Sequence, residues 1–349
     1  MDSRRALLLL LTLGAFACDE PRYTFLPGEW VNITGALSNL PSSCGDLTIL
    51  AVRPDEDELI AGVVANGLFH WPAGASDWTK LGQGAGSAKV DNDPTAFLFD
   101  PDHPGTYYES GIHVGTGVLI TRDGGDTFTR IGLNNNDYTA VDFADPDRKT
   151  MLVGAHENGQ HLFLSRDAGA TFTDLGPNFP SDCGDTSFPV LLDPQTFLVA
   201  TSQGPNPGIF LSTDGGGTFT TVFAGNVNSH PLFARDGTIS FMLVGDGGLV
   251  RSADQGRTWT RVVGAGVLLN LHVGLTELPD GRLLAVGTGT NYLLSSSDRG
   301  AHWTPISQLP YKPVGLAYSA PRRKVYIWRQ NCVDNDTVPL DAIMEHAFE

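Results

Sequence analysis

Short apolar runs separated by tight polar turns recur along the whole chain, and one stretch shows the pattern clearly. Runs at 139–143 and 150–154 flank an Asp-Pro-Asp turn, and runs at 161–165 and 171–175 flank a glycine-containing turn. The runs are rich in β-branched and aromatic residues, which favour strands, and proline followed by aspartate favours a hairpin turn. The pattern therefore predicts four short antiparallel strands per repeat.

An eight-residue phrase, S/T-x-D-x-G-x-T-W/F, marks the second kind of turn in five places, although the fifth copy has His302 at the threonine position. The aspartates of the phrase are separated by 44, 47, 40 and 44 residues, and they are Asp123, Asp167, Asp214, Asp254 and Asp298. A W/F-x-x-I/L/V dyad and the Pro/Asp/Gly turn signal each occur seven times. A repeat of 40–50 residues with four strands indicates the blades of a propeller.

The phrase resembles the Asp-box, or BNR repeat, which occurs in sialidases, sortilin-type receptor domains and a photosystem II assembly factor. The resemblance implies a β-propeller, in which these aspartates hold hairpin turns and take no part in catalysis. Aspartate accepts hydrogen bonds from backbone N–H groups in such a turn, and glycine supplies the positive φ. We predict an all-β fold, a seven-bladed propeller of four-stranded antiparallel blades, with six blades as the alternative.

The two ends of the chain are expected to share a blade. Residues 29–34 carry the seventh dyad without a box before it. Residues 312–349 supply only three of the four strands that a blade needs. A propeller avoids exposed strand edges by closing its ring. We therefore expect one propeller domain over 25–349, closed by the N-terminal strand.

The first residues indicate export. Residues 1–17 combine an arginine pair, a leucine run and small residues, which is typical of a signal peptide. Cys18 follows in a setting that resembles a bacterial lipobox, so we expect a lipidated tether over 18–24 and a location in the bacterial cell envelope. The formal charge of −17 argues against nucleic-acid partners, and we expect contact with the membrane through the lipid anchor only.

Three cysteines remain beyond Cys18, and an odd number leaves at least one unpaired within the chain. Cys44 enters the first blade and Cys332 lies in the last, so a Cys44–Cys332 disulfide would reinforce the closure. A Cys44–Cys183 pairing is the alternative.

The loops opposite the boxes are the usual ligand face of a propeller, and polar residues gather there. We select nine candidates for ligand contact: Asp46, His113, His156, Glu157, Asp185, His230, Asp246, Arg329 and Asp334. The stretch 156–161 is similar to the zinc-protease motif H-E-x-x-H, but its second histidine is one position too far and it lies in a hairpin. We therefore expect no metal site and no cofactor, with Ca²⁺ at the acidic loops 90–93 and 333–336 as the alternative.

These features favour a monomeric, non-catalytic binding or interaction module that recognises an envelope protein or glycan. A glycoside hydrolase is the alternative. The resemblance to sialidases does not extend to their catalytic residues, because a sialidase clamps the substrate carboxylate with an arginine triad. Here Arg122, Arg166, Arg251, Arg257 and Arg299 all lie in the boxes, on the wrong face. Another hydrolase with two carboxylates, such as Asp46 and Asp185, stays open.

Overall fold

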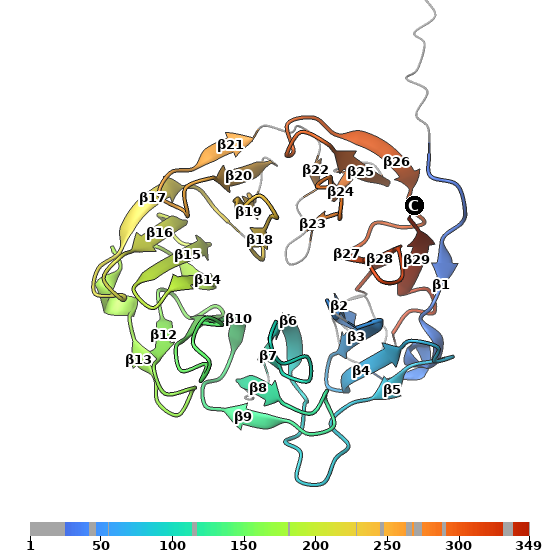
Figure 1. Ribbon diagram of the computed structural model, residues 1–349, viewed down its shortest axis with the longest axis horizontal. Helices are drawn as coiled ribbons and strands as arrows, with labels where there is room; N and C mark the ends of the chain where they lie inside the picture. Colours follow the sequence, from blue (N-terminus) through green and yellow to red (C-terminus); the bar gives the residue numbers. More distant parts are fainter. Residues whose placement is uncertain are drawn as a thin grey trace, which may run out of the picture.

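Seven antiparallel sheets stand around a ring, as predicted from the repeats (Figure 1). The computed structural model describes residues 25–41, 47–54, 56–113, 117–180, 182–227, 229–244, 248–262, 267–268, 274–287, 291–330 and 338–348. The seven-bladed prediction is confirmed and the six-bladed alternative is wrong. In the part of the chain that the structure describes, no helix is long and apolar enough to cross a bilayer.

Each blade is built from consecutive strands, except the last. Blade 1 is β2 (Leu47–Val52), β3 (Glu58–Val63), β4 (Gly67–Pro72) and β5 (Thr79–Lys80). Blade 2 is β6 (Asp93–Phe99), β7 (Tyr107–Ile112), β8 (Val118–Thr121) and β9 (Thr129–Ile131). Blade 3 is β10 (Asn136–Val141), β11 (Met151–Ala155), β12 (Leu162–Ser165) and β13 (Thr173–Asp174). Blade 4 is β14 (Asp185–Asp193), β15 (Thr196–Ser202), β16 (Gly208–Ser212) and β17 (Thr220–Ala224).

The other three blades follow the same plan with small departures. Blade 5 is β18 (Leu232–Phe233), β19 (Ile239–Met242), β20 (Leu249–Ser252) and β21 (Thr260–Val262). Blade 6 is β22 (Val267–Leu268) and β23 (Leu275–Glu277), both paired with β24 (Leu283–Gly287), then β25 (Tyr292–Ser296) and β26 (Thr304–Gln308). Blade 7 is β27 (Gly315–Ser319), β28 (Lys324–Trp328), β29 (Ile343–Ala347) and β1 (Val31–Asn32). Two short 3₁₀ helices are η1 (Gly35–Asn39) and η2 (Gly176–Asn178).

The hydrophobic core is divided among the junctions between blades. Seven clusters of buried side chains each join neighbouring blades; one packs Leu59 of blade 1 against Trp328 of blade 7, and another packs Leu152 of blade 3 against Phe197 of blade 4. The second strand of a blade is therefore covered on both faces, as β3 and β11 are, whereas outer strands such as β5 are exposed. Burial on both faces explains why the second strands are nearly continuous apolar runs.

The N-terminal strand closes the ring, which confirms the expected closure. β1 pairs antiparallel with β29, and the Ile33 N–H donates to the Ile343 carbonyl at 3.0 Å. The Thr34 hydroxyl accepts the Ile343 N–H at 3.0 Å. Beyond blade 7, Trp30 Nε1 donates to a blade 6 carbonyl at 3.0 Å, and Trp78 Nε1 of blade 1 donates to the Ile33 carbonyl at 2.8 Å. The N-terminal segment thus connects blades 6, 7 and 1.

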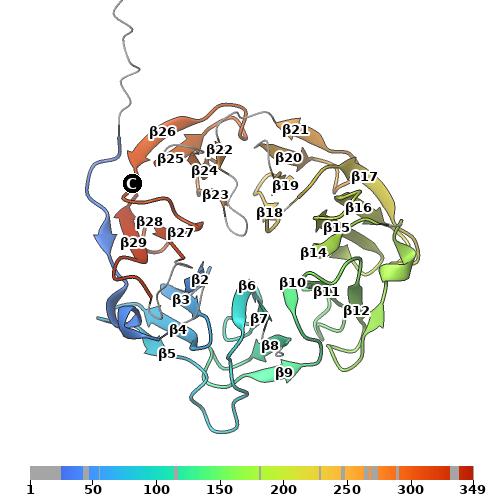
Figure 2. The same cartoon turned by 180° about the vertical axis from the view of Figure 1, so that it is seen from behind.

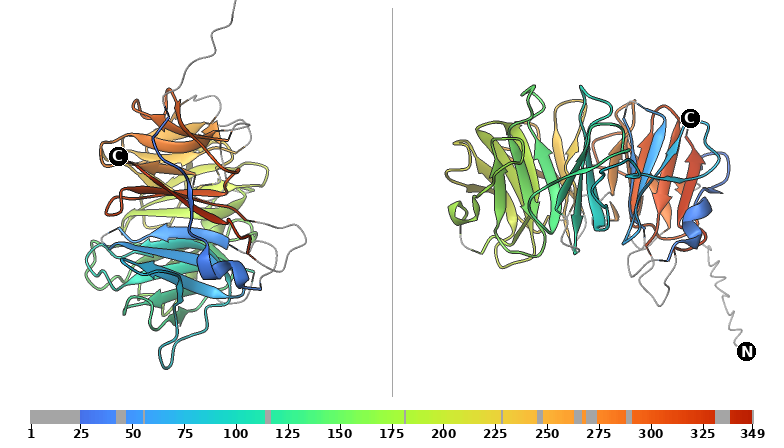
Figure 3. Two further views of the ribbon diagram at one scale, coloured as in Figure 1. Left: turned by 90° about the vertical axis from the view of Figure 1, so that its right-hand side faces the viewer. Right: turned by 90° about the horizontal axis from the view of Figure 1, so that it is seen from below.

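Because neighbouring strands are antiparallel, the connections of each blade alternate between two faces of the ring (Figures 2 and 3). We call the face with the first-to-second and third-to-fourth strand turns the turn face. It carries the five repeated phrases. We call the opposite face, with the second-to-third connections and the links between blades, the loop face.

On the turn face, each repeated aspartate is saturated by its own turn. In the first phrase, Asp123 Oδ1 accepts the Thr121 hydroxyl at 2.8 Å and the Thr127 N–H at 2.9 Å, while Oδ2 accepts the Thr127 hydroxyl at 2.6 Å. The other four phrases repeat this arrangement, with His302 replacing the threonine in the fifth. Hydrogen bonds from Thr258 lower the pKa of Asp254 to about 2.

Arginines on the turn face connect neighbouring blades. Among the described residues, an arginine side chain forms a hydrogen bond or ion pair across five of the seven junctions: Arg322 with Asp57, Arg53 with the Pro104 carbonyl, Arg148 with Asp100, Arg166 with the Pro194 carbonyl, and Arg299 with Asp236. These arginines therefore have structural partners on the face that carries the repeated phrases.

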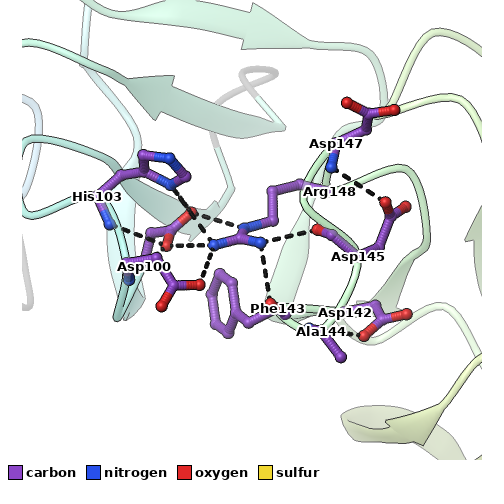
Figure 4. A network of polar contacts seen from close by, with 9 residues as sticks. Asp100, His103, Asp142, Phe143, Ala144, Asp145, Asp147 and Arg148 are labelled. Atoms are coloured by element: carbon purple, nitrogen blue, oxygen red, sulfur yellow. Dashed lines mark hydrogen bonds and ion pairs between the residues drawn. The ribbon is translucent and has the colours of Figure 1, made fainter.

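The junction of blades 2 and 3 holds the most buried of these ion pairs (Figure 4). Arg148 Nε and Nη2 each donate to Asp100 at 2.8 Å, and Nη1 donates to the carbonyls of Phe143 and Asp145. The Asp100 side chain is only 1% exposed. Burial by itself would raise the pKa of Asp100, but the hydrogen bonds from Arg148 hold it well below its usual value.

Candidate functional site

On the loop face, aspartates and histidines recur at matching places in neighbouring blades. Asp93 begins β6, Asp137 lies at the start of β10 and Asp185 begins β14, so each stands at the entrance of the innermost strand of its blade. His113 directly follows β7, and His156 directly follows β11. Blades 2 and 3 therefore place an aspartate and a histidine on paired strands at the same end.

The two histidines form equivalent pairs with the two aspartates. His113 Nδ1 lies 2.7 Å from Asp93 Oδ2, and His156 Nδ1 lies 2.8 Å from Asp137 Oδ1. The two imidazole rings are 5.2 Å apart and nearly perpendicular. His113 is 57% exposed at its side chain, whereas His156 is 16% exposed, so the first pair is open to solvent and the second is recessed.

Asn135 holds both histidine loops in place. Its Oδ1 accepts the His113 N–H at 2.9 Å, its Nδ2 donates to the His156 carbonyl at 3.0 Å, and its own carbonyl accepts the His156 N–H at 3.0 Å. Asn135, His113 and Glu157 have φ values of +62°, +64° and +44°. Left-handed backbone at residues other than glycine is uncommon and gathers at functional sites.

Asp185 and Glu157 complete the acidic surroundings of His156. Asp185 Oδ1 accepts the Gly159 N–H at 2.9 Å, and burial raises the pKa of Asp185 although that hydrogen bond opposes the rise. Glu157 Oε1 lies 3.9 Å from His156 Nε2, which is too far for a hydrogen bond. Burial alone would lower the pKa of His156, but its hydrogen bond to Asp137 and the nearby carboxylates raise it. We call Asp93, His113, Asp137, His156, Glu157 and Asp185 the Asp–His site.

Several buried polar atoms around this site have no hydrogen-bond partner within the described residues. They are Asp91 Oδ1, Asn92 Oδ1, Asp93 Oδ1, Asn136 Oδ1 and His156 Nε2. Beneath them, the fully buried Glu109 accepts hydrogen bonds from Asn92 Nδ2 at 3.0 and 3.1 Å, and burial raises the pKa of Glu109 to about 8. Native proteins pair nearly all buried polar atoms, so a cluster of unpartnered ones calls for an explanation.

Four of the nine sequence candidates come together in this site: His113, His156, Glu157 and Asp185. The other two described candidates lie elsewhere. His230 packs its ring against Tyr138 at 5.0 Å and lines a cavity of about 230 Å³ between the inner strands. Arg329 pairs with Asp341 of blade 7. Asp46, Asp246 and Asp334 lie outside the described residues, as do Cys18, Cys44 and Cys332.

The alternative disulfide partner, Cys183, is a free and buried cysteine, and burial raises the pKa of its thiol to about 11. It lines a cavity of about 530 Å³ together with Pro180, Pro205 and Phe210 of blade 4. This cavity is the larger one but holds no other titratable side chain. The Asp–His site, not this cavity, therefore combines charge and hydrogen-bonding capacity.

The arrangement can bind a polar ligand in more than one way. Each imidazole gives its Nδ1 to a carboxylate and leaves Nε2 available, a geometry that fixes the ring and its tautomer. Among the described residues, no three histidine, cysteine, aspartate or glutamate side chains converge so that they could hold a metal ion. The charge of Asp137 also contributes to the raised pKa of Asp185, after burial as the main cause.

The nine selected candidates did not include the two aspartates that orient the histidines, although Asp93 belongs to the acidic loop 90–93 considered for Ca²⁺. Their signal is a second repeat: D-x-T at 93–95 and 137–139, followed by G-x-H at 111–113 and 154–156. The paired residues are 20 and 19 positions apart. The glycines allow close packing, since a Cβ on Gly154 would lie 2.4 Å from the Thr186 carbonyl of blade 4. This repeat occurs in only two blades, so a search for features that recur in every blade does not find it.

Comparison with known proteins places the chain among β-propellers. No family model matches the chain, and no curated protein matches it. A GH74 xyloglucanase of Xanthomonas campestris is similar at 20% identity and a TM-score of 0.61, over 91% of this chain and 53% of that one. This chain thus spans about half the length of the xyloglucanase.

Two further solved structures are similar. YCF48 bound to D1 peptide matches at 14% identity and a TM-score of 0.59, over 94% of this chain and 100% of that one. The extracellular domain of the putative one component system BT4673 from B. thetaiotaomicron matches at 13% identity and a TM-score of 0.59, over 91% of this chain and 40% of that one. At these identities the likeness shows the fold alone.

Proposed function

We propose that this protein is an exported, lipid-anchored Asp-box propeller of a bacterial envelope that binds a protein segment at its Asp–His site without catalysing a reaction. The observation that carries the proposal is the pair of Asp–His contacts in adjacent blades, clamped together by Asn135. Rigid loops on a propeller suit recognition, because the ligand does not have to order them.

The similar structures support this choice in two ways. YCF48, which the chain matches over its full length, is bound to a peptide in its structure, and the BT4673 domains are extracellular. Export and anchoring rest on residues 1–18 of the sequence. They predict that the protein incorporates labelled fatty acid in its host and that Cys18→Ala abolishes this incorporation; an unlabelled wild-type protein would contradict the anchor.

Site-specific photocrosslinking in intact cells tests the binding function. A photoreactive residue at Glu157, which is 64% exposed, should capture a defined partner. The matched control is Asp147 on the turn face, which is 63% exposed. Capture at position 157 that is lost on Asn135→Ala would support the site. Equal capture at both positions, or capture at 147 alone, would contradict it.

A glycoside hydrolase is the second candidate, and the raised pKa of Asp185, to which the charge of Asp137 contributes, favours it. A protonated carboxylic acid next to an ionised one is what such hydrolysis requires. The xyloglucanase shares the fold over about half its length. Release of reducing ends from xyloglucan and other plant or envelope glycans, abolished by Asp185→Asn, would establish this activity in place of the binding function.

A further inference from the structure

The loop face of blades 2–4 is strongly biased toward acceptors and negative charge. The loops 89–93, 113–117, 132–137, 154–162, 180–186 and 203–207 contain one lysine, Lys89, and no arginine. The acidic residues of the same loops are Asp91, Asp93, Asp137, Glu157, Asp182 and Asp185. Lys89 already pairs with Asp91 at 2.8 Å. A ligand that brings positive charge would therefore meet little competition from the protein's own cations.

The unpartnered atoms have the same bias. Asn92 and Asn136 are fully buried, stand beside Asp93 and Asp137 at the ends of two inner strands, and each has an Oδ1 without a donor. Asp93 also has an unpartnered Oδ1, and its side chain is 13% exposed. All of these atoms are acceptors, and they need N–H or O–H groups to pair with.

The acceptors lie apart from one another, and this arrangement favours organic cations over metal ions as ligands. Metal ions need several ligands at one point, and among the described residues no three suitable side chains converge. The carboxylates of the Asp–His site instead extend over three blades. Guanidinium and ammonium groups carry several donors and bind carboxylates by charge-assisted hydrogen bonds.

We propose that the Asp–His site recognises arginine or lysine side chains of a basic protein segment, which donate to the carboxylates of Asp93, Asp137, Glu157 and Asp185. The inference rests on the proposed binding function and adds the chemistry of the ligand. His156 makes the interaction dependent on pH, because it lies among Asp137, Glu157, Asp185 and the ring of His113. As the pH falls, protonation of His156 adds positive charge to the site, and protonation of Asp185 removes negative charge from it.

The test uses the full chain in mild detergent and fluorescein-labelled (Gly-Arg)₄, (Gly-Gln)₄ and (Gly-Glu)₄ peptides, with binding followed by fluorescence anisotropy. We expect only (Gly-Arg)₄ to bind, and its affinity to fall about tenfold between pH 8 and pH 5.5. Preferential binding of (Gly-Glu)₄, or an affinity that rises as the pH falls, would overturn the inference.

Variants separate the site from the general negative charge of the chain. Asp137→Asn with Asp185→Asn should weaken (Gly-Arg)₄ binding at least about tenfold, and the exposed Glu157→Gln should weaken it by a smaller factor. The control, Asp147→Asn with Asp280→Asn, removes the same charge from the turn face and should leave the affinity unchanged. Equal loss in both double variants would assign the binding to net charge and overturn the inference.

Two further outcomes also count against it. Competition by millimolar CaCl₂ at constant ionic strength, lost in Asp137→Asn with Asp185→Asn, would make the site a calcium site instead. If none of the peptides binds while a partner is still captured at position 157 in cells, the binding function stands and the basic-ligand inference fails.

Discussion

Aspartates at the two faces of the same blades serve different purposes. On the turn face, Asp123 finds its partners within four residues, at 2.6 to 2.9 Å, and the other four repeated aspartates do the same. On the loop face, Asp93 and Asp137 reach histidines 20 and 19 positions away, and unpartnered atoms lie beside them. Repetition in five of the seven blades thus marks what builds the fold, and repetition confined to two blades marks a candidate for function.

The largest expected effect is on the pH dependence of stability, and it comes from Glu109, which is buried beneath the Asp–His site of the loop face. Burial raises its pKa from about 4.5 to about 8, so the folded protein keeps a proton that the unfolded chain loses between these values. The free energy of unfolding should therefore fall as the pH rises from 4.5 to 8. We expect Glu109→Gln to remove this decline and to be more stable than the wild type at pH 9, by up to about 5 kcal/mol.

Urea unfolding at pH 4, 6, 8 and 9 measures this effect. At pH 4 the two proteins should have equal stability, since Glu109 is then protonated in both states. Glu29→Gln, at an exposed position, serves as the control and should follow the wild-type profile. If the free energy of unfolding changed equally with pH in Glu109→Gln and in the wild type, Glu109 would be ionised in the folded protein and the prediction would be wrong.

The turn face should be most sensitive to loss of the buried ion pair in Figure 4. Arg148→Ala leaves the Asp100 carboxylate buried without its partner, which should cost about 3 kcal/mol in urea unfolding at pH 7. Lys149→Ala breaks an exposed ion pair in the same turn and should cost less than about 0.5 kcal/mol. A second substitution, Asp100→Asn, should recover part of the loss in Arg148→Ala; no recovery would mean that the charge of Asp100 is not the cause.

A matched pair of substitutions tests the comparison directly, with smaller effects on stability. Asp123→Asn loses acceptor capacity in its turn and should lower Tm by a few degrees while crosslinking at position 157 persists. Asp137→Asn should leave Tm within about two degrees of the wild type. It should lower the pKa of His156, as measured by NMR titration of the ring, and weaken the crosslink. The reverse pattern would mean that the faces have been assigned the wrong way round.

The fold was predictable from the sequence because the same aromatic–aliphatic dyad and the same turn signal each occur seven times. The dyads and turns fixed the number of blades, and residues 29–34 indicated the closure. The candidate site was predictable only in part. His113, His156, Glu157 and Asp185 were selected, but the roles of Asp93 and Asp137 depend on pairing across strands of one blade and on the approach of its neighbour. Such contacts have no local sequence signal beyond a repeat that occurs twice.

The closure by β1 also sets the order of assembly. Ile33 meets its partner Ile343 across 310 positions, so the first ordered strand has no place to pair until the last blade has formed. Contacts between such distant residues carry the largest loop-closure cost and form late in folding. During synthesis, the ring must therefore exist as an open arc with two unpaired edges. Any factor that protects this protein from aggregation would have to act on that arc before the final strand arrives.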